Sequence, residues 1–558
     1  MAEEGDRQRL AVHDALVERG FARVPGPRYD HYTGALDIPP KKVPVSLLIT
    51  DMNFVTLPII VIDESWVAPD RKLPHVIGPG GMLCYYAQGS VILDRYQPAR
   101  TIVQCIERAE KVMRDSLAGR LDDDFADEFA VHWGESWMLY DLPADFTGWG
   151  EIRYVRLGNS DGRTPVLTAG LSWTYERQTD RKRTSPDDIL VVAIDGALTV
   201  NPDMQWPPKN FGQLKEWLAW VDTGLPGSLD ESLTKGTAPE GNLAIRASNG
   251  LFAVRVEVPE GLRKQEFLKG RRSHLAQVLD RAPAAVKIER IRGDAADLDY
   301  IYRRNLGSRQ GLAGKCVLVL GCGTIGGFLA QQLAQCGAGT GGGRLVLLDN
   351  GTLQTANLGR HLLGVPFLHW SKSKACASFI NWMLPGANVE FVEGDALSYP
   401  HFDRFDLVVD ATGEEALSVA LNQRSIDRRP GGAPHIFVWL MGNGALAQAI
   451  LVDHDNNKAC LKCLKPDLSG EPRFRSLRPE VNVEIGSIAS CGDAEFVPFP
   501  VSRSVGAAAL ACDLIFDWAN GKDGDRFRSR TFDTSSAFMI ANSSPSPHRE
   551  CPACRTNH

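Results

Sequence analysis

The clearest pattern of apolar and polar positions lies in the C-terminal half of the chain. A short apolar run at 316–320 is typical of a buried strand, and the pattern at 328–334 predicts a helix. A second apolar run, 344–349, ends on an aspartate, and so does a third at 405–410. Strand, helix and strand in this order predict an α/β fold with a Rossmann-like parallel sheet.

The N-terminal region shows shorter apolar runs separated by polar turns. Runs at 43–49 and 58–62 predict strands and the pattern at 101–113 predicts a helix, as in a small α+β domain. Further on, strand-like runs such as 187–194 alternate with polar loops, and the Gly-, Ser-, Thr- and Pro-rich segment 225–242 predicts an exposed loop. We expect three domains, which are the α+β domain at 1–135, an α+β linking domain at 136–300 and the α/β domain at 301–558.

The composition indicates a multidomain protein without a disulfide framework. The chain has 558 residues, of which 44% are hydrophobic, and 12 cysteines. A net charge of -7 gives no reason to expect direct nucleic-acid binding or an acidic membrane surface. We find no signal peptide and no stretch of about 20 apolar residues, so we expect no membrane partner and a reducing, cytoplasmic location.

A glycine-rich loop connects the first strand to the helix, and it reads Gly321-Cys-Gly323-Thr-Ile-Gly326. The first glycine permits a tight turn, the second lets the backbone approach phosphate, and the third lets the helix pack on the strand. Asp349 follows the loop at about the sequence separation expected of an acid that binds ribose. The N-terminus of the helix offers free N–H groups to an anion. The motif alone is unspecific, but strand, loop, helix, strand and acid in this order predict a nucleotide site.

Four cysteines near the C-terminus form two Cys-x-x-Cys pairs. Cys460 and Cys463 make the first pair, and Cys551 and Cys554 make the second. Two such pairs can surround one ion with four thiolates, and a closed shell of this kind is typical of structural zinc. The alternatives are a redox dithiol or unrelated cysteines. The spacing favours a four-cysteine Zn²⁺ site.

The segment after Asp349 runs to Asn357-Leu-Gly-Arg360. This pattern of an acid followed by Asn-Leu-x-Arg resembles the superfamily of ubiquitin-activating enzymes and molybdopterin-synthase adenylyltransferases. The resemblance implies that Asp349 holds the ribose of ATP, while Asn357 and Arg360 hold its phosphates. It also implies a phosphate-binding lysine about a dozen residues on, for which Lys374 fits and Lys372 is the rival.

The same resemblance implies a Mg²⁺-binding acid after a later strand and an arginine that reaches a partner's ATP site in a homodimer. The family often has an aspartate where this chain has Gly413, so the sequence does not identify which acid binds Mg²⁺. The candidate acids are Asp410, Glu414 and Glu415, and the candidate arginines are Arg303, Arg304 and Arg309, of which we name Asp410 and Arg304.

Cys491 lies between the two cysteine pairs and before an apolar pattern that predicts a helix at about 504–518. The segment resembles the crossover loop that carries the thioester-forming cysteine in ubiquitin-activating enzymes. A thiolate at Cys491 would attack an acyl adenylate and keep the acyl group activated as a thioester. The alternative is a buried free cysteine, because some relatives adenylate without a cysteine intermediate.

The N-terminal domain has a turn with His75, then Gly81-Met-Leu-Cys84, Asp94-Arg-Tyr-Gln-Pro and a helix. This order resembles a ubiquitin-conjugating domain of the bacterial type. The resemblance implies that Cys84 accepts the acyl group, and His75 is then placed to stabilise the oxyanion as an amine attacks. Asp94 is placed to position or deprotonate that amine. The alternative is a small α+β domain with an incidental buried cysteine.

A conjugating-type domain, a linker and an activating-type domain in one chain resemble bacterial fusions found in antiphage operons, among them the CBASS systems. The resemblance implies ATP-dependent adenylation of a protein C-terminus, thioester formation at Cys491, transfer to Cys84 and conjugation to an amine on a target. The activated tail would belong to a ubiquitin-like protein or a cGAS-like nucleotidyltransferase. Two alternatives are a sulfur-carrier-protein adenylyltransferase and an NAD-dependent oxidoreductase.

Overall fold

A computed structural model describes residues 2–554, apart from 27–29, 64–71, 79, 88, 135, 157–161, 170–186, 238–239, 263–271, 385, 430 and 487–495. The chain divides into two compact units, Met1–Asp297 and Leu298–His558. No helix among the described residues is both long and apolar enough to cross a membrane.

The first sheet of the first unit is antiparallel and has the order β1-β2-β3-β4-β6-β5. Along β3 every second residue from Val43 to Ile49 is buried, because one face of the sheet packs on a core and the other does not. The strands and helix expected at 43–49, 58–62 and 101–113 are confirmed. The bounds are β1 Ala22–Val24, β2 Asp30–Ile38, β3 Lys41–Ile49, β4 Ile59–Ile62, β5 Val76–Ile77, β6 Met82–Leu83, α1 Ala2–Glu18 and α2 Pro98–Leu117.

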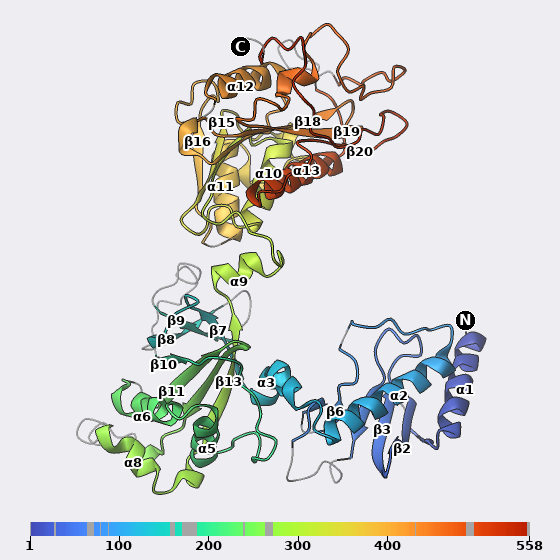
Figure 1. The fold of residues 1–558 in the computed structure, drawn as a ribbon, viewed down its shortest axis with the longest axis vertical. Helices are drawn as coiled ribbons and strands as arrows, with labels where there is room; N and C mark the ends of the chain where they lie inside the picture. Colours follow the sequence, from blue (N-terminus) through green and yellow to red (C-terminus); the bar gives the residue numbers. More distant parts are fainter. Residues whose placement is uncertain are drawn as a thin grey trace. The chain divides into compact units, whose positions relative to one another are not determined.

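The second part of this unit is a closed barrel of order β10-β11-β12-β13-β7-β9-β8, with helices α3, α5, α6 and α8 beside it (Figure 1). Its strands are β7 Ser136–Asp141, β8 Gly148–Val155, β9 Thr164–Thr168, β10 Asp187–Ala193, β11 Gly241–Ala247, β12 Gly250–Val256 and β13 Ile288–Ala295. In β10, Ile189 and Val191 belong to one core and Leu190 to the other, so the strand is buried on both faces. This explains its continuous apolar run.

The prediction of a loop at 225–242 is wrong over most of this segment. Residues Leu225–Lys235 form α6, and Leu225, Leu229 and Leu233 are buried against the barrel. These leucines recur every four residues, which is the helical period, and Pro226 stands in the first turn, where a helix tolerates it. The other helices here are α3 Phe125–Trp133, α5 Phe211–Val221 and α8 Leu275–Leu279, and a 3₁₀ turn at Asp122–Asp124 precedes α3.

The second unit contains the expected parallel sheet. Its order is β16-β15-β14-β17-β18-β19-β20, in which β16 to β18 are parallel and β19 and β20 are antiparallel additions. The strands are β14 Cys316–Leu320, β15 Arg344–Asp349, β16 Val389–Glu393, β17 Leu407–Asp410, β18 His435–Met441, β19 Leu446–Val452 and β20 Phe527–Thr531.

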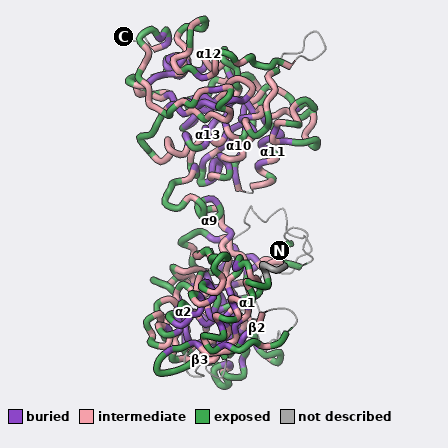
Figure 2. Tube along the Cα trace, turned by 90° about the vertical axis from the view of Figure 1, so that its right-hand side faces the viewer, coloured by how far each residue is buried: buried purple, intermediate pink, exposed green. Residues whose placement is uncertain are grey.

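Helices cover both faces of this sheet (Figure 1). Helices α10, α11 and α13 lie on one face, where Val317 and Val319 of β14 point, and α12 lies on the other with Leu318 and Leu320. Buried residues gather in the middle of the unit around α10 and α13 (Figure 2). The bounds are α9 Leu298–Arg303, α10 Thr324–Gln335, α11 Lys372–Met383, α12 Glu415–Asp427 and α13 Val501–Ala519.

Candidate functional site

A cavity of 430 Å³ opens at the carboxyl ends of the parallel strands. The loops after β14, β15, β16 and β17 line it, so it lies where the strand order of the sheet reverses. Open α/β sheets bind ligands at this switch point. The described polar and glycine residues of the lining include Gly321, Gly323, Asp349, Gly351, Lys372, Asp395, Thr412 and Glu414.

The three glycines of the loop meet three different spatial demands. Gly321 has a φ of +83°, and a Cβ there would lie 2.8 Å from the Cα of Thr412. A Cβ on Gly326 would lie 1.8 Å from the carbonyl oxygen of Gly321, so helix and loop pack in direct contact. A Cβ on Gly323 would meet no atom within 4 Å, because this position faces the cavity. These are the roles expected of a phosphate-binding loop.

Substitutions should separate these roles. Gly326→Ala should lower the free energy of unfolding by about 3 kcal/mol or more, because the methyl group overlaps a backbone carbonyl. Gly323→Ala should change it by less than about 0.5 kcal/mol, yet weaken ATP binding by filling the space that phosphate needs. Urea denaturation and calorimetric titration with MgATP measure the two effects. Equal loss of stability in both variants would contradict this assignment.

Asp349 holds the glycine loop in place. Its carboxylate accepts hydrogen bonds from the backbone N–H of Cys322 and of Gly351, both at 2.6 Å. Lys372 Nζ is nearby, since it would lie 3.4 Å from a Cβ on Gly351. Among the described residues that line the cavity, Lys372 is the single cation, whereas Asp349, Asp395 and Glu414 are acids. A polyphosphate in this cavity would need Lys372 and a metal ion to balance the acids.

His361 was not singled out from the sequence, although it anchors the same loop. Leu363 N–H donates to His361 Nδ1 at 3.1 Å, so Nε2 carries the proton and donates to the carbonyl of Cys322 at 2.7 Å. Burial lowers the pKa of His361, which suits this neutral tautomer. Thr324 Oγ1 also donates, to the carbonyl of Arg360 at 2.6 Å. The segment after Asn357 therefore braces the glycine loop.

Asn357, Arg360 and Lys374 do not occur among the described residues that line the cavity. Asn357 Oδ1 accepts the backbone N–H of Gln354 at 2.9 Å and caps a 3₁₀ turn at Thr355–Asn357. The Arg360 guanidinium lies 5.5 Å from the ring of Phe499, and Lys374 Nζ lies 5.8 Å from the ring of Trp370. Of the two rival lysines, the structure places Lys372 at the cavity.

Asp410 is buried at the end of β17, and its oxygens are used within its own loop. They accept Thr412 Oγ1–H at 2.7 Å, Thr412 N–H at 3.0 Å and Ser418 Oγ–H at 2.5 Å. Burial raises the pKa of this carboxyl, and the hydrogen bonds from Ser418 and Thr412 oppose that rise. Asp410 thus orients Thr412 toward the cavity.

The acids with access to the cavity come from two neighbouring loops. Glu414 lines it and is exposed, while the exposed Glu415 lies 3.7 Å from Lys465 Nζ and does not line it. Asp395 lines it from the loop after β16 and was missed in the sequence. The available signal was the pair Gly394-Asp395 directly after β16, because the parallel strands all end at one edge of the sheet.

The candidate arginines lie in and after α9. Arg303, Arg304 and Arg309 are all exposed. Arg303 pairs with Asp299 at 3.1 Å, and the guanidinium of Arg304 lies 5.7 Å from the ring of Tyr300. A role for one of them in the ATP site of a second copy stays a prediction.

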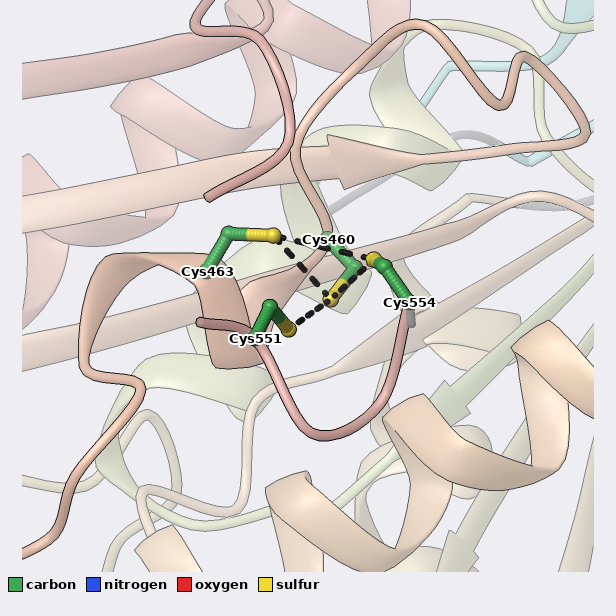
Figure 3. A group of neighbouring side chains, drawn as sticks. All are labelled: Cys460, Cys463, Cys551 and Cys554. Carbon is green, nitrogen blue, oxygen red and sulfur yellow. Dashed lines mark hydrogen bonds between the residues drawn. The ribbon is translucent and has the colours of Figure 1, made fainter. Parts of the chain in front are cut away.

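The four C-terminal cysteines come together, with their sulfurs turned toward one another (Figure 3). The S···S distances are 3.7 Å for Cys460–Cys463, 3.8 Å for Cys460–Cys551, 3.6 Å for Cys463–Cys554 and 3.3 Å for Cys460–Cys554. Disulfide sulfurs would lie about 2 Å apart. Four sulfurs at about 2.3 Å from one tetrahedral zinc would lie about 3.8 Å from each other, so the donor set fits a metal ion.

The cluster ties the C-terminal tail to the sheet. Cys460, Cys463 and Cys551 are fully buried. Asn422 Nδ2–H of α12 donates to Cys460 Sγ at 3.6 Å, and the backbone N–H of His548 donates to Cys463 Sγ at 3.4 Å. Such donors to the sulfurs favour the thiolate form that a metal requires.

Cys491 lies outside the described residues, which resume at Phe496. The helix expected at about 504–518 is confirmed as α13. Phe496 lies 5.8 Å from the guanidinium of Arg360, and Ser504 Oγ lies 2.6 Å from Thr324 Oγ1 in the first turn of α10. The chain after Cys491 therefore returns to the glycine loop and its bracing segment.

Cys84 is half-buried, and its Sγ lies 3.7 Å from the carbonyl oxygen of Tyr86. Its backbone N–H donates to the carbonyl of His75 at 2.8 Å. Cys84 Sγ, a ring nitrogen of His75 and a carboxylate oxygen of Glu128 all lie within 4.8 Å of one another. Burial and the charge of Glu128 raise the pKa of the thiol. The structure thus brings Cys84 and His75 together.

Asp94 is exposed in the turn that enters α2. Its Oδ1 accepts the backbone N–H of Tyr96 at 2.8 Å, and its carbonyl accepts Thr101 Oγ1–H at 2.8 Å. Among the described residues, these contacts of Asp94 stay within the turn. A role toward an incoming amine stays a prediction.

Comparison with known families gives a match for the C-terminal region and another for the N-terminal region. Residues 302–551 match the model of the ThiF family, and residues 28–140 match that of Prokaryotic E2 family B. The first range includes the glycine loop and the sulfur cluster as far as Cys551, and the second includes Cys84.

Similarity to curated proteins extends over nearly the whole chain. The ATP-dependent ubiquitin transferase-like protein Cap2 of Pseudomonas aeruginosa is 30% identical over 520 residues, which cover 91% of each chain. The Cap2 proteins of Escherichia coli and Vibrio cholerae are each 24% identical, over 78% and 85% of both chains respectively. The chain is an ATP-dependent enzyme of the adenylyltransferase type, and it belongs to the family of ATP-dependent ubiquitin transferase-like Cap2 proteins.

Proposed function

We propose that the chain activates the C-terminal carboxylate of a protein and conjugates it to an amine. ATP binds the cavity behind the glycine loop, and the substrate carboxylate attacks its α-phosphate to give an acyl adenylate and pyrophosphate. Cys491 displaces AMP and forms a thioester, Cys84 takes over the acyl group, and an amine on a target displaces the Cys84 thiolate. The protein substrate is a ubiquitin-like protein or a cGAS-like nucleotidyltransferase.

One observation carries this proposal. A single chain matches ThiF over a range that includes Cys491 and a conjugating-enzyme family over a range that includes Cys84. A sulfur-carrier adenylyltransferase would have no use for the Cys84 domain, and the resemblance to Cap2 proteins leaves the oxidoreductase alternative without support.

Within the nucleotide site we propose Lys372 rather than Lys374 as the phosphate-binding lysine, since Lys372 lines the cavity. We propose Asp395 and Glu414 as the acids nearest to a bound Mg²⁺, while the buried Asp410 positions Thr412. Mg²⁺ would neutralise the phosphates and draw charge from the leaving pyrophosphate. Arg360 would contact the phosphates from its position beside Phe496 and Phe499, which follow Cys491 in the chain.

The test uses the purified full chain with MgATP and a candidate protein substrate. The proposal expects ATP-dependent release of pyrophosphate and a covalent adduct on the chain that a thiol such as dithiothreitol removes. Intact-mass measurement of the unreduced protein detects the adduct. An adduct that survives the thiol, or that forms without ATP, would contradict thioester chemistry.

We also propose that the sulfur cluster binds one structural Zn²⁺ per chain. The double substitution Cys551→Ser and Cys554→Ser should release the metal and lower the Tm by about 10 °C or more, because the ion joins the tail to a buried core. Metal analysis and calorimetry measure both effects. Cys316→Ser is a matched control, because this cysteine is half-buried and lies outside the cluster. Intact reduced protein without zinc would end this assignment.

A further inference from the structure

The turn that carries His75 has an unusual conformation and is hydrogen-bonded to Cys84, which directly follows β6. His75 has a φ of +63°, a left-handed conformation that few residues other than glycine adopt. Its carbonyl accepts the backbone N–H of Cys84, and its ring lies beside Cys84 Sγ. A strained residue at a reactive cysteine requires the surrounding structure to hold it.

Two carboxylates hold the ring of His75. Glu128 contacts both the backbone and the ring of His75, since Oε2 accepts the His75 backbone N–H at 2.9 Å and Oε1 lies 2.7 Å from Nδ1 of the ring. Asp124 Oδ2 lies 2.8 Å from Nε2. The hydrogen bond to Glu128 raises the pKa of His75 above its ordinary 6.5, burial opposes this rise, and Asp124 adds to it. Both ring nitrogens therefore favour the protonated imidazolium.

Two further titratable groups among the described residues interact with Glu128. His132 Nε2 on α3 lies 3.4 Å from Glu128 Oε2, and the charge of Glu128 acts on Lys72 in the segment before His75. Burial of Glu128 would raise its pKa, but the hydrogen bonds from His132 and His75 outweigh burial and lower the pKa to about 2. Glu128 therefore stays charged near neutral pH.

The two carboxylates differ in exposure. The side chain of Glu128 is 14% exposed and that of Asp124 is 41% exposed. Nε2 is therefore the nitrogen that can exchange Asp124 for an oxygen of a substrate, while Nδ1 remains on Glu128. Glu128 itself is anchored from elsewhere, because Phe125, Phe129 and Trp133 of the same helix are buried in the barrel core. The barrel part of the unit thus supplies the support for the cysteine site.

We propose that Glu128 is a positioning residue for acyl transfer at Cys84, which fixes the His75 imidazolium beside the thioester carbonyl. This rests on the proposed function of Cys84. When an amine attacks the carbonyl carbon, a C–N bond forms and the carbonyl oxygen becomes an oxyanion facing the imidazolium. The C–S bond then breaks, its electron pair stays on Cys84 sulfur, and the proton lost by the nitrogen restores the thiol.

The test measures discharge of a thioester placed on Cys84 without ATP. Cys491→Ala protein is loaded by exchange with a short peptide thioester of mercaptoethanesulfonate, and a Cys84→Ala version checks that loading is at Cys84. Discharge to hydroxylamine is followed by intact mass from pH 5.5 to 9, which is about the range that brackets a raised histidine pKa. The variants are Glu128→Gln, Glu128→Asp, Asp124→Asn and His75→Gln, with Asp127→Asn as control because Asp127 is exposed on the same helix.

The imidazolium is present below the raised pKa of His75 and is lost as the pH rises through it, so discharge should slow there. Glu128→Gln should slow discharge about tenfold to a hundredfold near neutral pH and move this midpoint to lower pH. Glu128→Asp keeps the charge and should keep the midpoint nearer to that of the parent. Asp124→Asn should lower the midpoint by less than Glu128→Gln does. His75→Gln should remove this pH dependence, because no imidazole remains to titrate.

A purely structural role for Glu128 would lower the yield of folded protein without moving the midpoint. Coinciding curves for Glu128→Gln and Asp127→Asn would overturn the inference. Failure of the proposed function would look different, because the unmodified chain would then form no ATP-dependent thioester with any protein substrate, while the peptide-loaded experiment would still report on His75.

Discussion

Lys372→Ala should weaken the binding of MgATP about tenfold to a hundredfold, whereas Lys374→Ala should change it by less than about threefold. The reason is the charge of the cavity. Lys372 is the single cation among the described lining residues, and three carboxylates surround the same space. Without this ammonium group, the phosphates would face acids whose charge a metal ion alone must offset.

Lys374 is a matched control, because it lies two residues away on the same helix. Its ammonium group lies 5.8 Å from the ring of Trp370 and 6.0 Å from that of Phe391, so its removal takes away surface contacts of cation and ring. Calorimetric titration with MgATP measures both variants, and urea denaturation confirms that they are folded. A larger loss of MgATP binding in Lys374→Ala than in Lys372→Ala would contradict this assignment. It would indicate that Lys374 binds the phosphates and that they lie outside this cavity.

The local sequence pattern was sufficient to predict those parts of the fold and the site that depend on residues close together in the chain. The run 316–320, the glycine loop and the strand that ends on Asp349 follow one another in the chain, and the structure shows them as β14, a loop and β15. Each Cys-x-x-Cys pair carries its own local geometry, and two such pairs in one chain predict a four-sulfur site. The structure shows that the two pairs meet, with S···S distances of 3.3 Å and 3.8 Å between them.

Residues recruited from distant elements could not be read in this way. Glu128 looks like one of many acids on an amphipathic helix, and only the packing of α3 brings it to His75. His361 braces a loop that lies 39 residues earlier in the chain. The helix Leu225–Lys235 was mistaken for a loop because its Gly, Ser, Thr and Pro content was weighed above the four-residue spacing of its leucines.

The order of the two thiols gives the largest expected effects. Cys491→Ala should leave adenylation intact and abolish the thioester on the chain, because the adenylate then has no thiol to attack it. Cys84→Ala should allow one thioester, at Cys491, and should abolish conjugation. Cys512→Ala is a control, since this cysteine is buried on α13, and it should leave both steps unchanged.

The two cysteines belong to different units of the chain, so in the proposed reaction the acyl group would pass from the unit with the glycine loop to the unit with Cys84. A movement of one unit or a partner chain in a dimer would allow this transfer. Mixing Cys491→Ala protein with Cys84→Ala protein distinguishes the two routes, because conjugation in the mixture requires transfer between chains. Unreduced gels with MgATP and substrate, repeated with added thiol, follow each thioester. Normal conjugation by Cys84→Ala alone would remove the conjugating role and leave an adenylating enzyme whose N-terminal domain serves another purpose.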